Sequence, residues 1–267
     1  MQKYNGLLVH QEIDEFGAIE IVETDGVRAL HFGSDSRQSS MTINLPNELH
    51  SVYTRTMMSG LLFNETPRHV LMVGLGGGVL PKYLLYHFSD CKIKVIELRP
   101  AMVKIARRFF SLPLEPRLKI KIADGAHYIK QQSLQSPRQH DFILLDAFDH
   151  AGMADTVQGI NFFSACKELL TDEGILIINL WGSNADLFQQ MAWEMGTTFN
   201  WKVLFLPVRG RGNVIGIAFA EGVDKFSLQA LRKKAVLLEE QYQIEFPDFV
   251  KDLKRNNASI LKRVINS

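Results

Sequence analysis

The sequence predicts an α/β protein built on one open, mainly parallel sheet, and three observations support this fold class. Short apolar runs alternate with helix-like runs over residues 70–199, a pattern typical of a parallel sheet with helices on both faces. The apolar run 70–74 leads into a glycine-rich turn, "GLGGG" at 74–78, which a helix-like run follows. Two strand-like runs joined by a short turn end the alternation near residue 220.

The bulk composition fits one large soluble domain, alone or with a small appendage. The chain has 267 residues, of which 46% are hydrophobic and 22% charged, and its net charge is +1. This balance gives no electrostatic reason to expect nucleic acid or a membrane surface as a partner. Cys91 and Cys166 lack any metal-ligand spacing, so we expect reduced thiols, a cytoplasmic protein and no bound metal. We also expect no signal peptide and no membrane span.

The first 63 residues predict a small sheet and then a helix. Residues 7–45 are short alternating runs separated by turn signals such as Asp25-Gly26, which is typical of an antiparallel sheet of hairpins. From Pro46 to Phe63, apolar residues recur at spacings of three and four, which predicts a helix. We therefore divide the chain into a β-rich subdomain, residues 1–45, and an α/β domain, residues 46–267.

The α/β domain is predicted to contain five buried strands with helices between them. The expected strands are 70–74, 93–97, 118–122, 141–146 and 175–180, and the expected helices are 79–88, 101–110, 125–132, 159–170 and 185–199. The hairpin that follows pairs 201–207 with 213–220, and two helices are expected within 227–265. A terminal hairpin is uncommon in nicotinamide-binding folds and typical of methyltransferase-like ones, so we predict a seven-stranded, methyltransferase-like (Rossmann-type) sheet.

The glycine turn and three acidic strand ends predict a nucleotide site. The dinucleotide motif G-x-G-x-x-G would place its third glycine at Val79, whereas this turn has the spacing G-x-G-x-G. Glu97, Asp124 and Asp146 stand at or just after the carboxyl ends of predicted strands, where open α/β sheets bind ligands. An acid at the position of Glu97 suits the ribose hydroxyls of an adenosine and, taken alone, would suit NAD as well. Each acid alone could instead cap a helix or lie in a solvated turn.

These motifs resemble the spermidine synthase family, within the S-adenosylmethionine-binding, methyltransferase-like fold. The resemblance covers residues 36 to 220. The family has a G-G-G-D-G-G turn, an acid ending the next strand, Asp-Gly or Asp-Ala after the third strand, and D-S-S-D-P after the fourth. This chain has "GLGGGV" at 74–79, Glu97, "DGA" at 124–126 and "DAFDH" at 146–150.

The resemblance implies a role for each residue of the nucleotide site. It implies that S-adenosylmethionine, or its decarboxylated form, is bound as co-substrate by the 46–267 domain. The residues implied are Gly74, Gly76 and Gly78 along the methionine part, Glu97 at the ribose, Asp124 and Gly125 at the adenine, and Gln38 reaching in from the N-terminal sheet.

For the chemistry, the resemblance implies aminopropyl transfer to a small-molecule amine. The amine attacks a carbon bonded to the positively charged sulfur, and it must first lose a proton because free alkylamines titrate near pH 10.4. Asp146 is the implied catalytic base, with Tyr53 and Asp149 binding the amine substrate. We also expect a homodimer that uses the N-terminal sheet.

Three departures from the family keep other functions open. The acid of the family's glycine turn is Gly77 here, its His-Glu after the tyrosine is Thr54-Arg55, and the proline of D-S-S-D-P is His150. We expect Arg55 to place like charges together beside a diamine. Methyl transfer from S-adenosylmethionine, or nucleotide binding without transfer, therefore stand beside aminopropyl transfer as alternatives.

Overall fold

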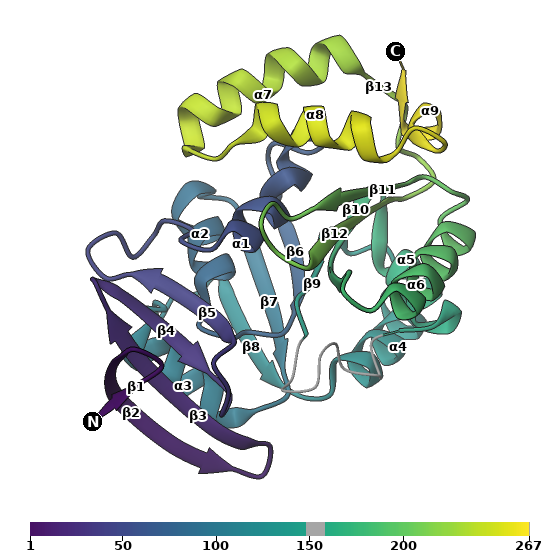
Figure 1. Cartoon of the computed structure of the whole chain (residues 1–267). Helices are drawn as coiled ribbons and strands as arrows, with labels where there is room; N and C mark the ends of the chain where they lie inside the picture. The colour runs from purple at the N-terminus through teal and green to yellow at the C-terminus, as the bar shows by residue number, and fades with distance from the viewer. Residues whose placement is uncertain (148–157, 267) are drawn as a thin grey trace.

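The computed structural model describes residues 1–147 and 158–266 and contains two main sheets (Figure 1). The N-terminal sheet has five antiparallel strands in chain order, with each strand beside the next. Its strands are β1 (Gln2–Lys3), β2 (Gly6–Asp14), β3 (Gly17–Thr24), β4 (Val27–His31) and β5 (Arg37–Thr42). This sheet agrees with the antiparallel sheet that the alternating runs predicted.

The central sheet has seven strands in the order β11-β12-β10-β9-β6-β7-β8. All are parallel except β12, which runs antiparallel to both of its neighbours, so the predicted terminal hairpin is confirmed. The strands are β6 (His69–Val73), β7 (Lys92–Glu97), β8 (Leu118–Ile122), β9 (His140–Leu145), β10 (Leu170–Trp181), β11 (Val203–Pro207) and β12 (Asn213–Phe219).

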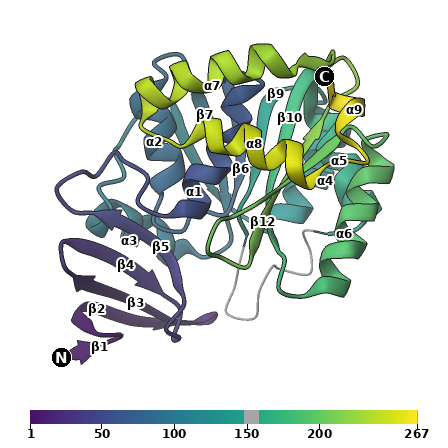
Figure 2. The ribbon, with the colours of Figure 1, turned by 45° about the horizontal axis from the view of Figure 1, so that its top comes forward.

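Helices cover both faces of the central sheet. They are α1 (Val52–Met57), the 3-10 helix η1 (Met58–Leu62), α2 (Val79–His87), α3 (Pro100–Phe109), α4 (Gly125–Gln135), α5 (Ile160–Leu169), α6 (Ala185–Thr198), α7 (Leu228–Tyr242), α8 (Phe246–Asn256) and α9 (Leu261–Val264). Helices α7 and α8 pack side by side, away from the N-terminal strands (Figure 2). The sequence did not predict a third, two-stranded sheet. It pairs β13 (Phe226–Ser227), just before α7, with β14 (Ile265–Asn266), just after α9, and so joins the two ends of the C-terminal helical segment.

The core consists of two apolar clusters, one on each face of the central sheet. Along β6, Val70 and Met72 belong to the first cluster, whereas Leu71 and Val73 belong to the second, as the period of two in a strand requires. The first cluster also contains residues of α2, α3, α7 and α8, and the second contains residues of α4, α5 and α6. The inner face of the N-terminal sheet joins the first cluster, so this sheet is seated on the α/β core.

The predicted helix over 46–63 was too long at its start. The helix begins at Val52, and residues 46–51 form turns instead. The carbonyl groups of Leu49 and His50 accept hydrogen bonds from the Arg55 guanidinium, at 3.2 and 2.9 Å, rather than from helical backbone N–H groups. The Arg55 side chain thus takes the place of helical N–H donors at these two carbonyl groups. The spacing of apolar residues in the sequence cannot reveal such a contact.

Strand β11 forms one edge of the central sheet, and a side chain covers its free backbone. The side-chain amide of Asn257 accepts from the N–H of Phe205 at 2.7 Å and donates to its C=O at 2.8 Å. Asn257 is 1% exposed, so this contact fixes the segment after α8 against the strand. In the described part of the chain, helices that combine the length and the apolar character of a membrane span are absent.

Candidate active site

A cavity of about 1400 Å³ lies at the carboxyl end of the central sheet. The N-terminal sheet forms one wall, and the loop between β11 and β12 borders it on another side. Most of the sequence-predicted site residues line this cavity: Gln38, Tyr53, Gly74, Gly76, Glu97, Asp124, Gly125 and Asp146. Gly78 does not line it, and Asp149 lies outside the described residues.

The first glycine of the turn is required by packing between two strands. Gly74 has φ of +91°, and a Cβ atom at this position would come 2.2 Å from the backbone oxygen of Asp146. Only glycine therefore lets the ends of β6 and β9 approach this closely. Gly78 precedes α2 and packs against Leu112, so of the three glycines predicted at the ligand, Gly74 and Gly76 reach the cavity.

The structure explains why Gly77 replaces an acid. A Cβ atom at Gly77 would lie 2.8 Å from the Ser39 hydroxyl and 2.9 Å from the Phe110 ring. Ser39 is on β5, so the N-terminal sheet occupies the space that a side chain on this turn would need. A side chain at position 77 would therefore collide with Ser39 of β5 and with the Phe110 ring at the end of α3.

Glu97 connects the end of β7 to the glycine turn. Its Oε2 accepts the N–H of Leu75 and its Oε1 accepts the N–H of Arg99, both at 2.7 Å. The side chain is 6% exposed, and this burial raises the pKa of the carboxyl above its usual value while the backbone N–H groups oppose the rise. Each oxygen keeps a lone pair for a ligand hydroxyl, so Glu97 can brace the turn and bind a ribose.

Asp124 is a helix cap that also borders the cavity. Its Oδ1 accepts the N–H of His127 at 2.7 Å, so the side chain caps the N-terminus of α4. Gly125 begins that helix, and a Cβ there would lie 2.4 Å from a methyl group of Val73. The sequence allowed Asp124 to be either a helix cap or a residue of the nucleotide site. The structure is compatible with both, because the cap lies in the cavity wall.

Asp146 is a buried acid of the cavity whose carboxylate is held by two side chains. Its Oδ1 accepts from the Asn179 side-chain amide at 2.9 Å, and its Oδ2 lies 3.4 Å from the Tyr53 hydroxyl. Burial raises the pKa of Asp146 to about 6, and the two hydrogen bonds oppose this rise. The pKa of Tyr53 is raised well above its ordinary value by burial and by Asp146, so the phenol remains a neutral donor. Asp146 can therefore accept a proton near neutral pH.

Sequence reasoning missed two residues here: Asn179, which contacts Asp146, and Asn213, which contacts Asn179. Asn179 is 3% exposed on β10, and its Oδ1 accepts from the Asn213 side-chain amide at 3.0 Å. The hydrogen-bonded series Asn213–Asn179–Asp146 holds Oδ1 of the carboxylate. Tyr53 lies at Oδ2, and its hydroxyl also lies 3.1 Å from the carbonyl oxygen of Gln38. A polar residue inside the apolar run "ILIINL" was the available signal for Asn179. No comparable signal marked Asn213.

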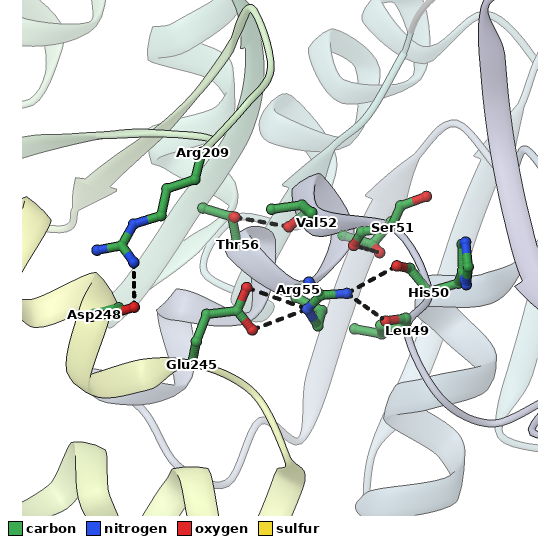
Figure 3. A network of polar contacts seen from close by, with 10 residues as sticks. Leu49, His50, Ser51, Val52, Arg55, Thr56, Arg209, Glu245 and Asp248 are labelled. Atoms are coloured by element: carbon green, nitrogen blue, oxygen red, sulfur yellow. Dashed lines mark hydrogen bonds and ion pairs between the residues drawn. The ribbon is translucent and has the colours of Figure 1, made fainter.

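The expectation that Arg55 places its charge beside the amine substrate was wrong. The Arg55 guanidinium points away from the cavity toward α8, where its Nε lies 3.0 Å from Oε2 of Glu245, and it also donates to the two carbonyls at 49 and 50 (Figure 3). Arg55 is not among the lining residues. Its charge is neutralised behind the cavity wall because helix α8, distant in sequence, supplies the partner acid.

Helix α8 also holds a second segment of the cavity wall. Arg209, at the beginning of the β11–β12 loop, donates to Asp252 at 2.7 Å and is also paired with Asp248 (Figure 3). The next loop residues, Gly210 to Gly212, line the cavity. Helix α8 thus anchors, through Glu245, Asp248 and Asp252, both the 49–53 segment and this loop.

The strand order and the cavity at the carboxyl edge place the protein in the methyltransferase-like class of α/β folds. The family model described as "Spermine/spermidine synthase domain" matches residues 50–206. A polyamine aminopropyltransferase of Chromobacterium violaceum is 34% identical over 250 residues, which cover 93% of this chain and 94% of that protein. The chain belongs to the spermine/spermidine synthase family.

Two solved structures show the same fold. Human methyltransferase-like protein 13, solved in complex with SAH, superposes with a TM-score of 0.67 at 26% identity, covering 72% of this chain and 93% of that chain. A spermidine synthase solved with the transition-state analogue AdoDATO gives a TM-score of 0.64 at 22% identity, covering 82% of this chain and 75% of that chain. Similarity therefore extends to both of the transferase classes that the sequence left open.

Proposed function

We propose that this protein transfers an aminopropyl group from decarboxylated S-adenosylmethionine to an amine. The observation that carries the proposal is the arrangement of Asp146, a carboxylate with a pKa of about 6 held between Asn179 and Tyr53 at the cavity. Membership of the spermine/spermidine synthase family and the similarity to a polyamine aminopropyltransferase support the same reaction.

The nucleotide fits the part of the cavity around the glycine turn. Gly76 lines the cavity with φ of +51°, and an added Cβ there would meet Ser39 at 3.8 Å, so the glycine keeps the backbone bare on the side of the cavity. Glu97 is placed to accept ribose hydroxyls, with Asp124 and Gly125 beside the adenine and Gln38 closing the site from β5. The cavity volume of about 1400 Å³ exceeds what one nucleotide needs, which leaves room for an acceptor.

The reaction requires a deprotonated amine at the electrophilic carbon. The amine nitrogen forms a bond to the carbon next to sulfur, the carbon–sulfur bond breaks, and its electron pair leaves with methylthioadenosine. The nitrogen loses one proton, which Asp146 accepts, while Tyr53 and Asn179 hold the carboxylate in position. This proposal assigns no metal to the reaction.

The proposal extends to organisation and location. Residues 1–45, which contain the five-stranded sheet, form a subdomain, and residues 46–267 form the nucleotide-binding domain. The protein acts in the cytoplasm. Exposed Leu7 and Ile13 on β2 support a homodimer formed through the N-terminal sheet. Light scattering of the parent and of Ile13→Glu tests this assembly, with a monomeric parent as the contradicting result.

Release of methylthioadenosine tests the proposed reaction. The full chain is incubated with decarboxylated S-adenosylmethionine and a panel of amines, and the thioether is measured. Calorimetry with methylthioadenosine and with adenosylhomocysteine is run in parallel. Release of methylthioadenosine with any amine supports the proposal. Tight binding of the nucleotide without release from any amine would remove aminopropyl transfer.

Methyl transfer is the second candidate. Gly77 leaves the turn without the acid of the aminopropyltransferase motif, and human methyltransferase-like protein 13 covers 72% of the chain at 26% identity. A preference for adenosylhomocysteine over methylthioadenosine in the same calorimetry would favour this reaction.

A further inference from the structure

Arg99 links the nucleotide end of the cavity to the N-terminal sheet. Its backbone N–H donates to Oε1 of Glu97 at 2.7 Å, just before α3 begins. Its guanidinium reaches across to the turn between β2 and β3. Both Arg99 and Glu97 line the cavity. One residue thus contacts the proposed ribose acid with its main chain and the N-terminal sheet with its side chain.

The guanidinium of Arg99 forms a bidentate ion pair at the β2–β3 turn. Its Nε and Nη2 donate to the two carboxylate oxygens of Asp14, at 3.1 and 2.7 Å, and Nη2 also donates to the carbonyl oxygen of Gly17 at 3.1 Å. The ring centres of Phe32 and Phe16 lie 4.5 and 5.7 Å from the guanidinium carbon. The Arg99 side chain is 10% exposed, so these contacts lie largely out of water, where such pairs are strong.

The turn that Arg99 holds is part of the cavity wall. Glu15 and Phe16 in this turn line the cavity, together with Phe32 at the end of β4. Asp14 also shapes the turn, because its Oδ1 accepts the N–H of Phe16 at 2.9 Å. Among the ion pairs of the described residues, the one between Asp14 and Arg99 joins residues 1–45 to the rest of the chain. Arg99 therefore ties this wall to the end of β7.

We propose that Arg99 is a positioning residue for the nucleotide: it holds the β2–β3 turn in place as a wall of the nucleotide end, so that binding of the nucleotide at Glu97 and closure of this turn stabilise each other. The inference rests on the proposed nucleotide site and adds to it a residue that acts through the turn. A wall already in place loses less freedom when the ligand binds, which raises affinity. By linkage, the ligand must stabilise the wall to the same extent.

The charge of Arg99 offers a second route to the same effect. Burial raises the pKa of Glu97, while the N–H and the positive charge of Arg99 lower it, so loss of the charge could weaken a ligand through Glu97 alone. Asp14 separates the two routes, because its removal frees the turn while the charge of Arg99 remains.

Calorimetry on the full chain with methylthioadenosine, and with adenosylhomocysteine in parallel, tests the proposal. Arg99→Met and Asp14→Ala should each weaken binding by about tenfold. Arg99→Lys should lose less, because it keeps the charge and one donor group for Asp14. The double variant Asp14→Ala/Arg99→Met should lose no more than either single variant, since both changes break one contact.

Arg28→Met is the matched control. Arg28 also joins the N-terminal sheet to the α/β domain, by donating to the carbonyl oxygen of Phe109, and it does not line the cavity. Its removal loosens the seat of the sheet without freeing the β2–β3 turn, so nucleotide affinity should stay within about twofold of the parent.

Hydrogen exchange of the peptide over residues 12–18 measures closure of the turn directly. In the parent, saturating methylthioadenosine should slow exchange in this peptide by at least about threefold. The slowing should disappear in Arg99→Met at a ligand concentration that still saturates the variant. A merely structural role of Arg99 would speed exchange with and without the ligand and leave the ratio between them unchanged.

The outcomes separate this inference from the proposed function. Weakened binding in Arg99→Met with unchanged binding in Asp14→Ala assigns the effect to the charge at Glu97 and overturns the proposal. Losses that add in the double variant, an equal loss in Arg28→Met, or an exchange ratio that the nucleotide leaves unchanged also overturn it. Release of methylthioadenosine is measured separately, so absence of turnover with these binding results intact removes only aminopropyl transfer.

Discussion

The nucleotide end and the acceptor end of the cavity are built by different means. At the nucleotide end, Glu97 holds backbone N–H groups of Leu75 and Arg99, and Gly74 fits β6 against β9. The Glu97 contacts join a side chain to main-chain N–H groups, and the Gly74 contact joins the main chains of two neighbouring strands. At the acceptor end, Tyr53, Asp146, Asn179 and Asn213 come from α1, the end of β9, β10 and β12, and they meet through side chains alone.

The difference teaches which end can change without loss of the fold. Contacts to the main chain at the nucleotide end tolerate few substitutions, because the main-chain groups involved also lie at the ends of the sheet strands. Side chains at the acceptor end can be exchanged while the strands stay in place. We therefore expect substitutions at the acceptor end to alter turnover and selectivity more than nucleotide affinity, and the following predictions test that separation.

The largest effect is expected for Asp146→Asn. The variant keeps the shape of the side chain and loses the proton acceptor, so turnover should fall by about 10²–10⁴-fold. Nucleotide affinity should change little, since Asp146 belongs to the acceptor end. Methylthioadenosine release and calorimetry measure the two properties. In the parent, the rate should rise with pH through the Asp146 pKa of about 6, because the charged form is the base. Full activity of the variant would contradict this role.

Glu97→Gln should weaken nucleotide binding, by about 1.5–3 kcal/mol, the usual value of hydrogen bonds to a charged group. The amide cannot accept at both of its ends as the carboxylate does for Leu75 and Arg99. Calorimetry with methylthioadenosine measures the change. Asp124→Asn, which keeps the helix cap, is the comparison variant. Unchanged affinity in Glu97→Gln would remove Glu97 from the ribose site.

The same Asp146→Asn variant should be more stable than the parent above pH 6. The pKa of Asp146 is raised in the folded state from 3.8 to about 6, so folding favours the protonated form. The carboxyl therefore lowers stability by about 1–3 kcal/mol once it is charged in both states, and this cost vanishes as the pH falls below about 4. Urea unfolding at pH 7.5 and pH 4 measures the difference, and an equal gain at both values would contradict the assignment.

Asn179→Ala should change the pH profile more than the amount of bound nucleotide. The Asn179 amide stabilises the charged form of Asp146, so its loss raises the Asp146 pKa further and moves the acid limb of the rate profile to higher pH. We expect kcat at pH 7 to fall by about tenfold. Asn213→Ala, one contact further away, should give a smaller shift. A profile that keeps its position would assign Asn179 a packing role alone.

The smallest effect on chemistry is expected for Arg55→Met. Loss of the contacts to Glu245 and to the carbonyls of Leu49 and His50 should lower the free energy of unfolding by about 1–2 kcal/mol. The KM of the acceptor should rise a few-fold at most, because Arg55 acts on the cavity only through the 49–53 segment. A large fall in KM for diamines would instead place the Arg55 charge at the acceptor.

The sequence predicted the parts of the molecule that depend on local pattern. Apolar runs predicted the central sheet, and the acids at strand ends predicted Glu97, Asp124 and Asp146 at one cavity. The contacts of Arg55 and the burial of Gly77 could not be predicted. Arg55 contacts Glu245, which lies 190 residues later in the chain. Gly77, at the end of the central sheet, faces Ser39 of the N-terminal sheet. Both contacts follow from tertiary packing and leave no local pattern in the sequence.

The contact between Asn257 and Phe205 has a consequence for colloidal behaviour. Backbone pairing of Lys202 and Val208 with β12 turns the groups of Val203, Phe205 and Pro207 outward. Asn257 is hydrogen-bonded to both the N–H and the C=O of Phe205, and Pro207 has no N–H. A strand of another molecule would therefore find few free backbone hydrogen-bonding groups along this edge. On the opposite edge, β8 exposes Lys119 and Lys121. Both borders of the central sheet thus resist strand addition, which protects a concentrated protein against aggregation.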